Sequence, residues 1–140
     1  MLHDPKREAQ IAEEIFHASL EPWQRLLLQA VDEIRARGWV AGAYVSVGFK
    51  NGSVCIMGAL RFADHWLVDE VKGMHHIKKR GSRAYMAATR NLGDYLKPVV
   101  IKYREWLIGD TPQSYVETYN DGHIDTTEDV IRVLHTVALG

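Results

Sequence analysis

The chain contains one cysteine, Cys55, and its thiol is the side chain best suited to covalent chemistry. A thiol at the start of a helix can have a lowered pKa and act as a nucleophile when a histidine beside it takes the proton. His123 is the candidate base, and Asp121 or Asp125 would orient its imidazole ring. Apolar residues flank Cys55 on both sides, however, which is typical of a small buried hydrophobic side chain. We favour the buried interpretation, because a catalytic triad is defined by geometry and the sequence does not bring these residues together.

A basic segment, residues 73–83 with the sequence GMHHIKKRGSR, is the strongest candidate for binding. Its lysines and arginines would release counterions on contact with nucleic-acid phosphates, and its glycines let the backbone approach a phosphate closely. Ser82 would add an anion contact at the start of a helix, and Tyr85 is close enough in sequence to stack on a base. The alternative is a solvated loop, or one that pairs with the acidic C-terminal third of the chain. The residues that would carry the binding are Lys78, Lys79, Arg80, Ser82 and Arg83.

The net charge of −1 conceals an uneven distribution of charge along the chain. Between Lys72 and Arg90 every charged residue is basic, whereas between Glu105 and Asp129 every charged residue is acidic. A chain divided in this way can bind an anionic partner with one face, or it can pair its own two halves. The sequence leaves both arrangements open, and it leaves both nucleic acid and a host protein open as the partner.

Two groups of polar residues resemble metal ligands only in part. Residues 120–125, NDGHID, alternate oxygen and nitrogen ligands, but they lack the twelve-residue calcium loop and its bidentate glutamate. We interpret them as a turn whose Asn and Asp side chains bond to the backbone, or in which Asp121 reaches back to backbone donors near Gly38. His75 and His76 are adjacent, so their rings diverge on regular structure. We therefore expect neither a metal nor a cofactor.

Helical patterns dominate the segments that must position these side chains. Asp4 followed by Pro5 is typical of a helix start, and we expect this helix to run to about Ala18. This helix has fewer apolar residues than a buried helix needs, and they form a narrow stripe. An exposed stripe of this kind is compatible with a homodimer formed through residues 7–18. Apolar residues at helical spacing then predict a second helix over 20–37, ended by a glycine.

The centre of the chain can be interpreted in two ways. Residues 43–49 alternate between apolar and polar, and Asn51-Gly52 follows them, which indicates a β-hairpin. The return arm would be short. Ser53 can instead cap a helix over 54–64, and we prefer this helix because its apolar residues recur at helical spacing.

Three helices are predicted in the remaining half. Ser82 caps the first, and Pro98 should kink it or end it. A short helix follows over 112–119, then a turn at 120–122, and Thr126 caps the last helix. The fold class is therefore mainly α: a single compact domain over residues 1–140, with five or six helices and at most one small β-hairpin near residues 43–56. The N-terminal helix, within 1–19, would be peripheral.

The composition bounds the class of protein. Hydrophobic residues make up 46% and charged residues 25%, which are ordinary globular values. No apolar run is long enough for a membrane span, and the N-terminus lacks the apolar stretch of a secretory signal. A single cysteine excludes an internal disulfide. We therefore expect a soluble, cytoplasmic protein.

Three short motifs resemble those of a family of small uncharacterised proteins from high-GC Gram-positive bacteria and their phages. The first two are Gly38-Trp39 with Gly42 after a helix, and Cys55-x-x-Gly58-Ala59-Leu60 with Ala63; the third is Tyr119-Asn120-Asp121 leading into Thr127 and Val130. The chain departs from the family in residues 64–110, which are longer and more basic, and at Tyr119, where a tryptophan is more usual. The resemblance implies a bacterial or phage origin, and hence a location in the cytoplasm of a bacterial host cell, but it carries no activity.

Together these observations predict a non-enzymatic, phage- or prophage-type binding protein that contacts a macromolecule through the basic segment. The alternative is a small cysteine-dependent enzyme that uses Cys55 with His123.

Overall fold

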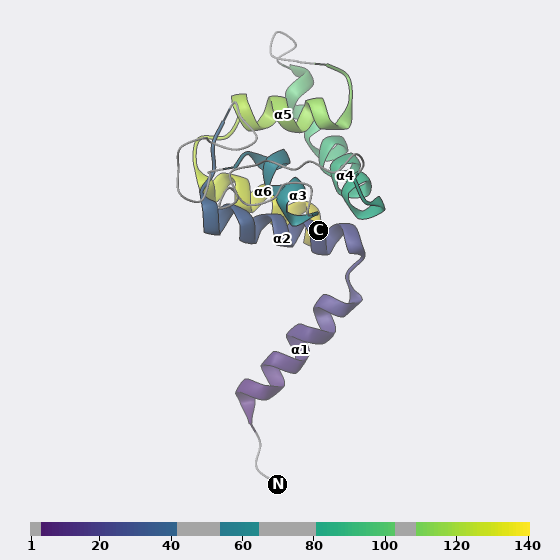
Figure 1. The fold of residues 1–140 in the computed structure, drawn as a ribbon, viewed down its shortest axis with the longest axis vertical. Helices are drawn as coiled ribbons and strands as arrows, with labels where there is room; N and C mark the ends of the chain where they lie inside the picture. The colour runs from purple at the N-terminus through teal and green to yellow at the C-terminus, as the bar shows by residue number, and fades with distance from the viewer. Residues whose placement is uncertain (1–3, 42–53, 65–80, 103–108) are drawn as a thin grey trace, which may run out of the picture.

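The computed structural model describes residues 4–41, 54–64, 81–102 and 109–140, and these ranges form a mainly helical, compact domain (Figure 1). Within them no strand is present. The helices are α1 (Pro5–Ser19), α2 (Pro22–Arg37), α3 (Ile56–Ala63), α4 (Arg83–Val100), α5 (Pro112–Gly122) and α6 (Thr127–Leu139). The predicted fold class is thus confirmed.

The short helix α3 lies at the centre of the domain. It is apolar on all sides, and every one of its residues except Arg61 is buried. A helix of this kind requires partners around it. α2 and α5 both pack on it, while α2 also packs on α4 and α6, and α4 packs on α5. The Gln24 side chain adds a polar link between α2 and α6, because its Nε2 donates to the carbonyl oxygen of Ala138 at 2.8 Å.

The start of α3 differs from its prediction. The N-cap is Cys55 and not Ser53, so the helix begins two residues later than expected. The reason is that Val54 is extended and forms a parallel bridge with Trp39. The Val40 N–H donates to the Val54 carbonyl at 3.0 Å, and the Val54 N–H donates to the Gly38 carbonyl at 2.8 Å. The hairpin predicted from residues 43–49 and Asn51-Gly52 lies outside the described residues and stays a prediction.

The C-terminal helices follow their predictions with one correction. Pro98 lies in the last turn of α4, which ends at Val100, and Thr126 caps α6 by accepting from the Asp129 N–H at 3.2 Å. α5, however, continues through residues 120–122, where a turn was predicted. An asparagine favours a turn when its side chain bonds to its own backbone. Three of the four hydrogen bonds of the Asn120 side chain instead join groups that are distant in sequence, on Trp39, Val40 and Ile56, and the helix continues to Gly122.

α1 stands apart from the other helices. It begins where predicted, with Asp4 accepting from two N–H groups of the first turn, but none of its residues is buried. Figure 1 shows it extending away from the rest of the domain. Within the described ranges, no helix combines the length and the apolar character that crossing a lipid bilayer requires.

Gly93 gives a test of the contact between α4 and α5. A Cβ at this position would lie 2.6 Å from the Pro112 Cα and 2.7 Å from the Pro112 carbonyl oxygen. Because backbone atoms occupy that space, we expect Gly93→Ala to lower the free energy of unfolding by about 1–3 kcal/mol in urea denaturation.

The matched control is Gly122→Ala, where an added Cβ meets nothing within 4 Å. It should leave the free energy of unfolding unchanged or raise it by a few tenths of a kcal/mol, because alanine favours a helix more than glycine. Equal effects of the two substitutions would contradict this close approach.

Candidate functional site

The Asn120 side chain is the polar centre of the fold. It is 2% exposed, and both its oxygen and its nitrogen form two hydrogen bonds each, which is the full number that a side-chain amide can make. Its Oδ1 accepts from the Trp39 Nε1 at 2.8 Å and from the Ile56 backbone N–H at 3.0 Å. Its Nδ2 donates to the Val40 carbonyl at 3.3 Å and to the Asp121 carboxylate at 3.0 Å. One amide therefore joins α5 to the segment after α2 and to the first turn of α3.

Cys55 lies next to this junction and serves the backbone of α3. Its Sγ accepts from the Gly58 N–H at 3.3 Å, and the residue is buried. Burial raises the pKa of the Cys55 thiol, and the nearby Asp121 carboxylate adds to the increase, while the N–H groups of Gly58 and Met57 oppose it. The thiol is therefore neutral near pH 7, whereas a nucleophilic cysteine needs the thiolate.

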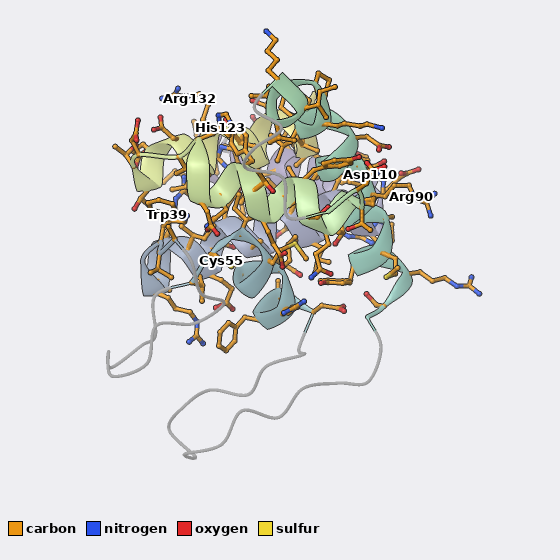
Figure 2. The ribbon with its side chains drawn as sticks, turned by 90° about the horizontal axis from the view of Figure 1, so that it is seen from above. Trp39, Cys55, Arg90, Asp110, His123 and Arg132 are labelled. Atoms are coloured by element: carbon orange, nitrogen blue, oxygen red, sulfur yellow. The ribbon has the colours of Figure 1, made fainter. Side chains whose placement is uncertain are left out.

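The structure does not bring His123 to this thiol. Among the described residues, the charged groups that act on the Cys55 thiol are Asp121 and Arg61. The His123 ring instead stacks on Tyr119, with 5.2 Å between centroids and 12° between planes. Figure 2 shows Cys55 and His123 on different sides of α5. Asp121 accepts a hydrogen bond from the Asn120 Nδ2, which also donates to the Val40 carbonyl oxygen, two residues after Gly38. The contact of Asp121 with backbone donors near Gly38 stays a prediction.

The predicted binding residues are only partly described. Lys78, Lys79 and Arg80 lie outside the described residues, whereas Ser82 and Arg83 lie within them. Ser82 caps α4, since its Oγ accepts from the Tyr85 N–H at 3.1 Å. The Ser82 Oγ also donates to one carboxylate oxygen of Asp64 at 2.6 Å, and its N–H donates to the other at 2.9 Å. The hydroxyl group and the backbone N–H of Ser82 therefore both take part in hydrogen bonds within the protein.

Tyr85 does not match its predicted role in base stacking. It is 3% exposed, and its hydroxyl accepts from the Arg61 Nε at 3.4 Å. Exposed basic residues nearby are Arg83 and Arg90, which lie two turns apart on the same side of α4. Asp94 follows one turn after Arg90, and Figure 2 shows Asp110 on the same side of the molecule as Arg90. This surface is basic at the N-terminal end of α4 and mixed toward its other end.

A separate hollow of about 340 Å³ lies where α4, α5 and α6 meet. Burial raises the pKa of the Tyr119 hydroxyl in its wall, and the neighbouring Tyr95 and Asp129 add to the increase. The Arg132 Nη2 lies 3.5 Å from the Asp129 Oδ1, which partly neutralises both. The lining residues are Tyr95, Tyr119, His123, Asp129, Arg132, Val133 and Thr136. Among the described residues, no group of three or more His, Cys, Asp or Glu is placed to hold a metal ion.

A comparison with protein families identifies the relatives of this chain. The model of DUF6197, a family of unknown function, matches residues 18–139. The chain belongs to DUF6197. Neither the curated proteins nor the solved structures contain a match. The resemblance to an uncharacterised family is confirmed, and almost all of α1 lies outside the matched residues.

In this member of DUF6197, the structure brings residues of the three sequence motifs together. Trp39, the residues around Cys55, and Asn120 come from the three motifs, and the Asn120 hydrogen bonds bring them together. Sequence reasoning missed Asn120 as the centre of this junction. The signal that could have found it was that one motif contains a side-chain amide, Asn120, and another contains an indole N–H donor, Trp39.

Replacing Asn120 should show how much the junction stabilises the fold. We expect Asn120→Ala to lower the free energy of unfolding by about 2–4 kcal/mol, because the Ile56 N–H and the Trp39 Nε1 lose their acceptor in a buried position. Urea denaturation measures this value. Asn91→Ala, at a half-exposed position of α4, is the control and should change stability by less than about 0.5 kcal/mol. A similar loss in both variants would contradict the role of the amide.

The Cys55 thiol should react poorly in the folded chain. With a chromogenic disulfide reagent near pH 7, we expect the folded chain to react on the order of a hundredfold more slowly than the denatured chain. The folded pKa of the thiol is raised, so its contribution to stability is present below the unfolded pKa and is lost as the pH rises through the alkaline range. An exposed thiol in the variant Cys55→Ala/Glu128→Cys is the control for reagent access. Equal rates for the folded and the denatured chain would restore the nucleophile hypothesis.

Proposed function

We propose that this protein is a non-enzymatic module that binds an anionic macromolecule, with nucleic acid as the best fit, through the basic segment and the adjoining face of α4. The observation that carries the proposal is the pair of exposed arginines in the first half of α4, Arg83 and Arg90. Both arginines belong to the stretch from Lys72 to Arg90, in which every charged residue is basic. Clustered positive charge attracts a phosphate backbone and releases its counterions.

The bonds between Asp64 and Ser82 support this arrangement. They fix the first residue after α3 and the N-cap of α4 against each other. The basic residues that precede Ser82 in the sequence therefore adjoin a rigid helix start. A fixed start reduces the entropy that is lost when neighbouring side chains are ordered on a partner.

The alternative, a cysteine-dependent enzyme, has less support. The burial of Cys55 and the raised pKa of its thiol disfavour a thiolate nucleophile, and His123 stacks on Tyr119. A host protein with an acidic surface is the second class of partner, because the same charges would attract it. The resemblance of the three motifs to phage and bacterial sequences supports a phage- or prophage-type protein that acts in the host cytoplasm.

Charge reversal tests the proposal directly. We expect the full chain to bind a labelled DNA duplex of about 20 base pairs, with a dissociation constant that rises steeply with salt. The variant Lys78→Glu/Lys79→Glu/Arg80→Glu/Arg83→Glu should bind far more weakly, and the slope of log K against log salt should become shallower by about three to four. Fluorescence anisotropy at several salt concentrations measures both quantities.

A matched control separates this effect from net charge. Arg80→Glu/Arg83→Glu and Arg35→Glu/Arg132→Glu change the net charge equally, but Arg35 and Arg132 are exposed on α2 and α6. Only the first pair should weaken binding strongly. If the two pairs weaken binding alike, or if the wild-type chain does not bind the duplex, the nucleic-acid proposal is wrong.

A further inference from the structure

The hollow where α4, α5 and α6 meet has the size of a site for a small ligand. Its volume of about 340 Å³ falls within the range of about 300–1,000 Å³ that ligand pockets occupy in proteins. One water takes about 30 Å³ of the liquid, so this space holds roughly ten waters or one heterocyclic ring system. A ligand there would contact side chains from all three helices, including Tyr95, Tyr119 and Asp129.

This hollow is separate from the basic face of α4. His123 and Arg132 both line it, and Figure 2 shows these two residues on the side of the molecule away from Arg90. The described residues that line it include no lysine and a single arginine. A nucleic-acid strand is bound along a positively charged groove that follows its backbone. The hollow therefore fits a free small molecule, and its ligand is independent of the proposed binding to nucleic acid.

Aromatic rings from two helices form part of the wall of the hollow. Tyr95 of α4 is 51% exposed, so its ring is accessible to a ligand. Tyr119 and His123 of α5 are stacked, with 12° between the planes of their rings. Val133 of α6 adds an apolar contact. Aromatic side chains bind flat heterocycles by stacking on their π-faces. The wall therefore favours a planar ligand over a flexible chain.

The formal charges of Asp129 and Arg132 in the hollow cancel. The Arg132 Nη2 and the Asp129 Oδ1 lie 3.5 Å apart. An anion would be attracted by the guanidinium group and repelled by the carboxylate, and the reverse holds for a cation, so the pair favours a neutral ligand. The contact joins one nitrogen of the guanidinium group, which carries five N–H donors, to one of the two carboxylate oxygens. Hydrogen-bond acceptors and donors therefore lie side by side in the wall.

We propose that this hollow binds the guanine base of a free nucleoside, with Asp129 and Arg132 contacting the edge of the base and the tyrosine rings contacting its face. Among the four common bases, guanine alone presents two neighbouring N–H donors, at N1 and N2, followed by two neighbouring acceptors, O6 and N7, along one edge. A carboxylate accepts from the two donors, and a guanidinium group donates to the two acceptors. Adenine, cytosine and uracil each offer a single donor group on this edge. The order of groups in guanine therefore matches the Asp129–Arg132 pair.

Equilibrium dialysis of the full chain against labelled guanosine tests the proposal. We expect a dissociation constant on the order of 0.1 mM, because a single ring system buries little area. Adenosine, cytidine and uridine should bind at least about tenfold more weakly, and so should 1-methylguanosine, in which the N1 donor is blocked. Similar affinities for all four nucleosides, unchanged binding of 1-methylguanosine, or no binding of guanosine at about ten times the expected dissociation constant would each overturn the proposal.

Matched variants locate the bound nucleoside. Asp129→Asn replaces one acceptor with a donor and should weaken guanosine binding at least about tenfold, whereas the control Glu128→Gln removes the same charge from the preceding, exposed residue and should leave it unchanged. Tyr95→Ala should also weaken binding, while Met86→Ala, another exposed position of α4, should not.

The variant with four charge reversals in the basic segment should bind guanosine as the wild type does, which separates this site from the proposed nucleic-acid face. All of these chains should keep the thermal unfolding temperature of the wild type within a few degrees, because the changed side chains of α4 and α6 are at least partly exposed. Equal losses in Asp129→Asn and Glu128→Gln, or in Tyr95→Ala and Met86→Ala, would place the ligand elsewhere and overturn the proposal.

Discussion

A single buried amide, that of Asn120, holds together the parts of the chain that meet at the centre of this fold. Burying an amide costs free energy unless its donors and acceptor are all bonded, and here the protein supplies a partner to each. The amide also provides the acceptor that the first N–H of α3 lacks. At eight residues, α3 is too short to be stable alone. Its position depends on this bond and on the apolar contacts with α2 and α5.

Local signals in the sequence were sufficient for most of the helices. Asp4, Ser82 and Thr126 cap helices as predicted, because a cap depends on residues that are close in sequence. The errors occur where a distant contact overrides the local preference. Val54 pairs with Trp39 and delays the start of α3, and the tertiary bonds of Asn120 extend α5 through a predicted turn. Neither contact can be derived from spacing along the chain.

The candidate site was predictable to a smaller degree. The burial of Cys55 followed from its apolar neighbours, and the structure places the thiol in the core. The hydrogen bonds between Ser82 and Asp64 did not follow, because they depend on how the end of α3 meets the start of α4. The hollow lined by Tyr95, Tyr119 and His123 is likewise formed by side chains from different helices. In this protein, groups that the sequence offers as reactive or ligand-binding, such as the Cys55 thiol and the Ser82 hydroxyl, form hydrogen bonds within the fold instead.

The bonds between Asp64 and Ser82 also bear on how the family can vary. They close the stretch between α3 and α4 at its base, so the helices on either side are positioned without reference to the length of chain between them. A change in the number of residues between 64 and 82 therefore leaves these two ends, the C-cap of α3 and the N-cap of α4, bonded to each other. New sequences, including new charges, can accumulate there in evolution while the surrounding helices keep their arrangement.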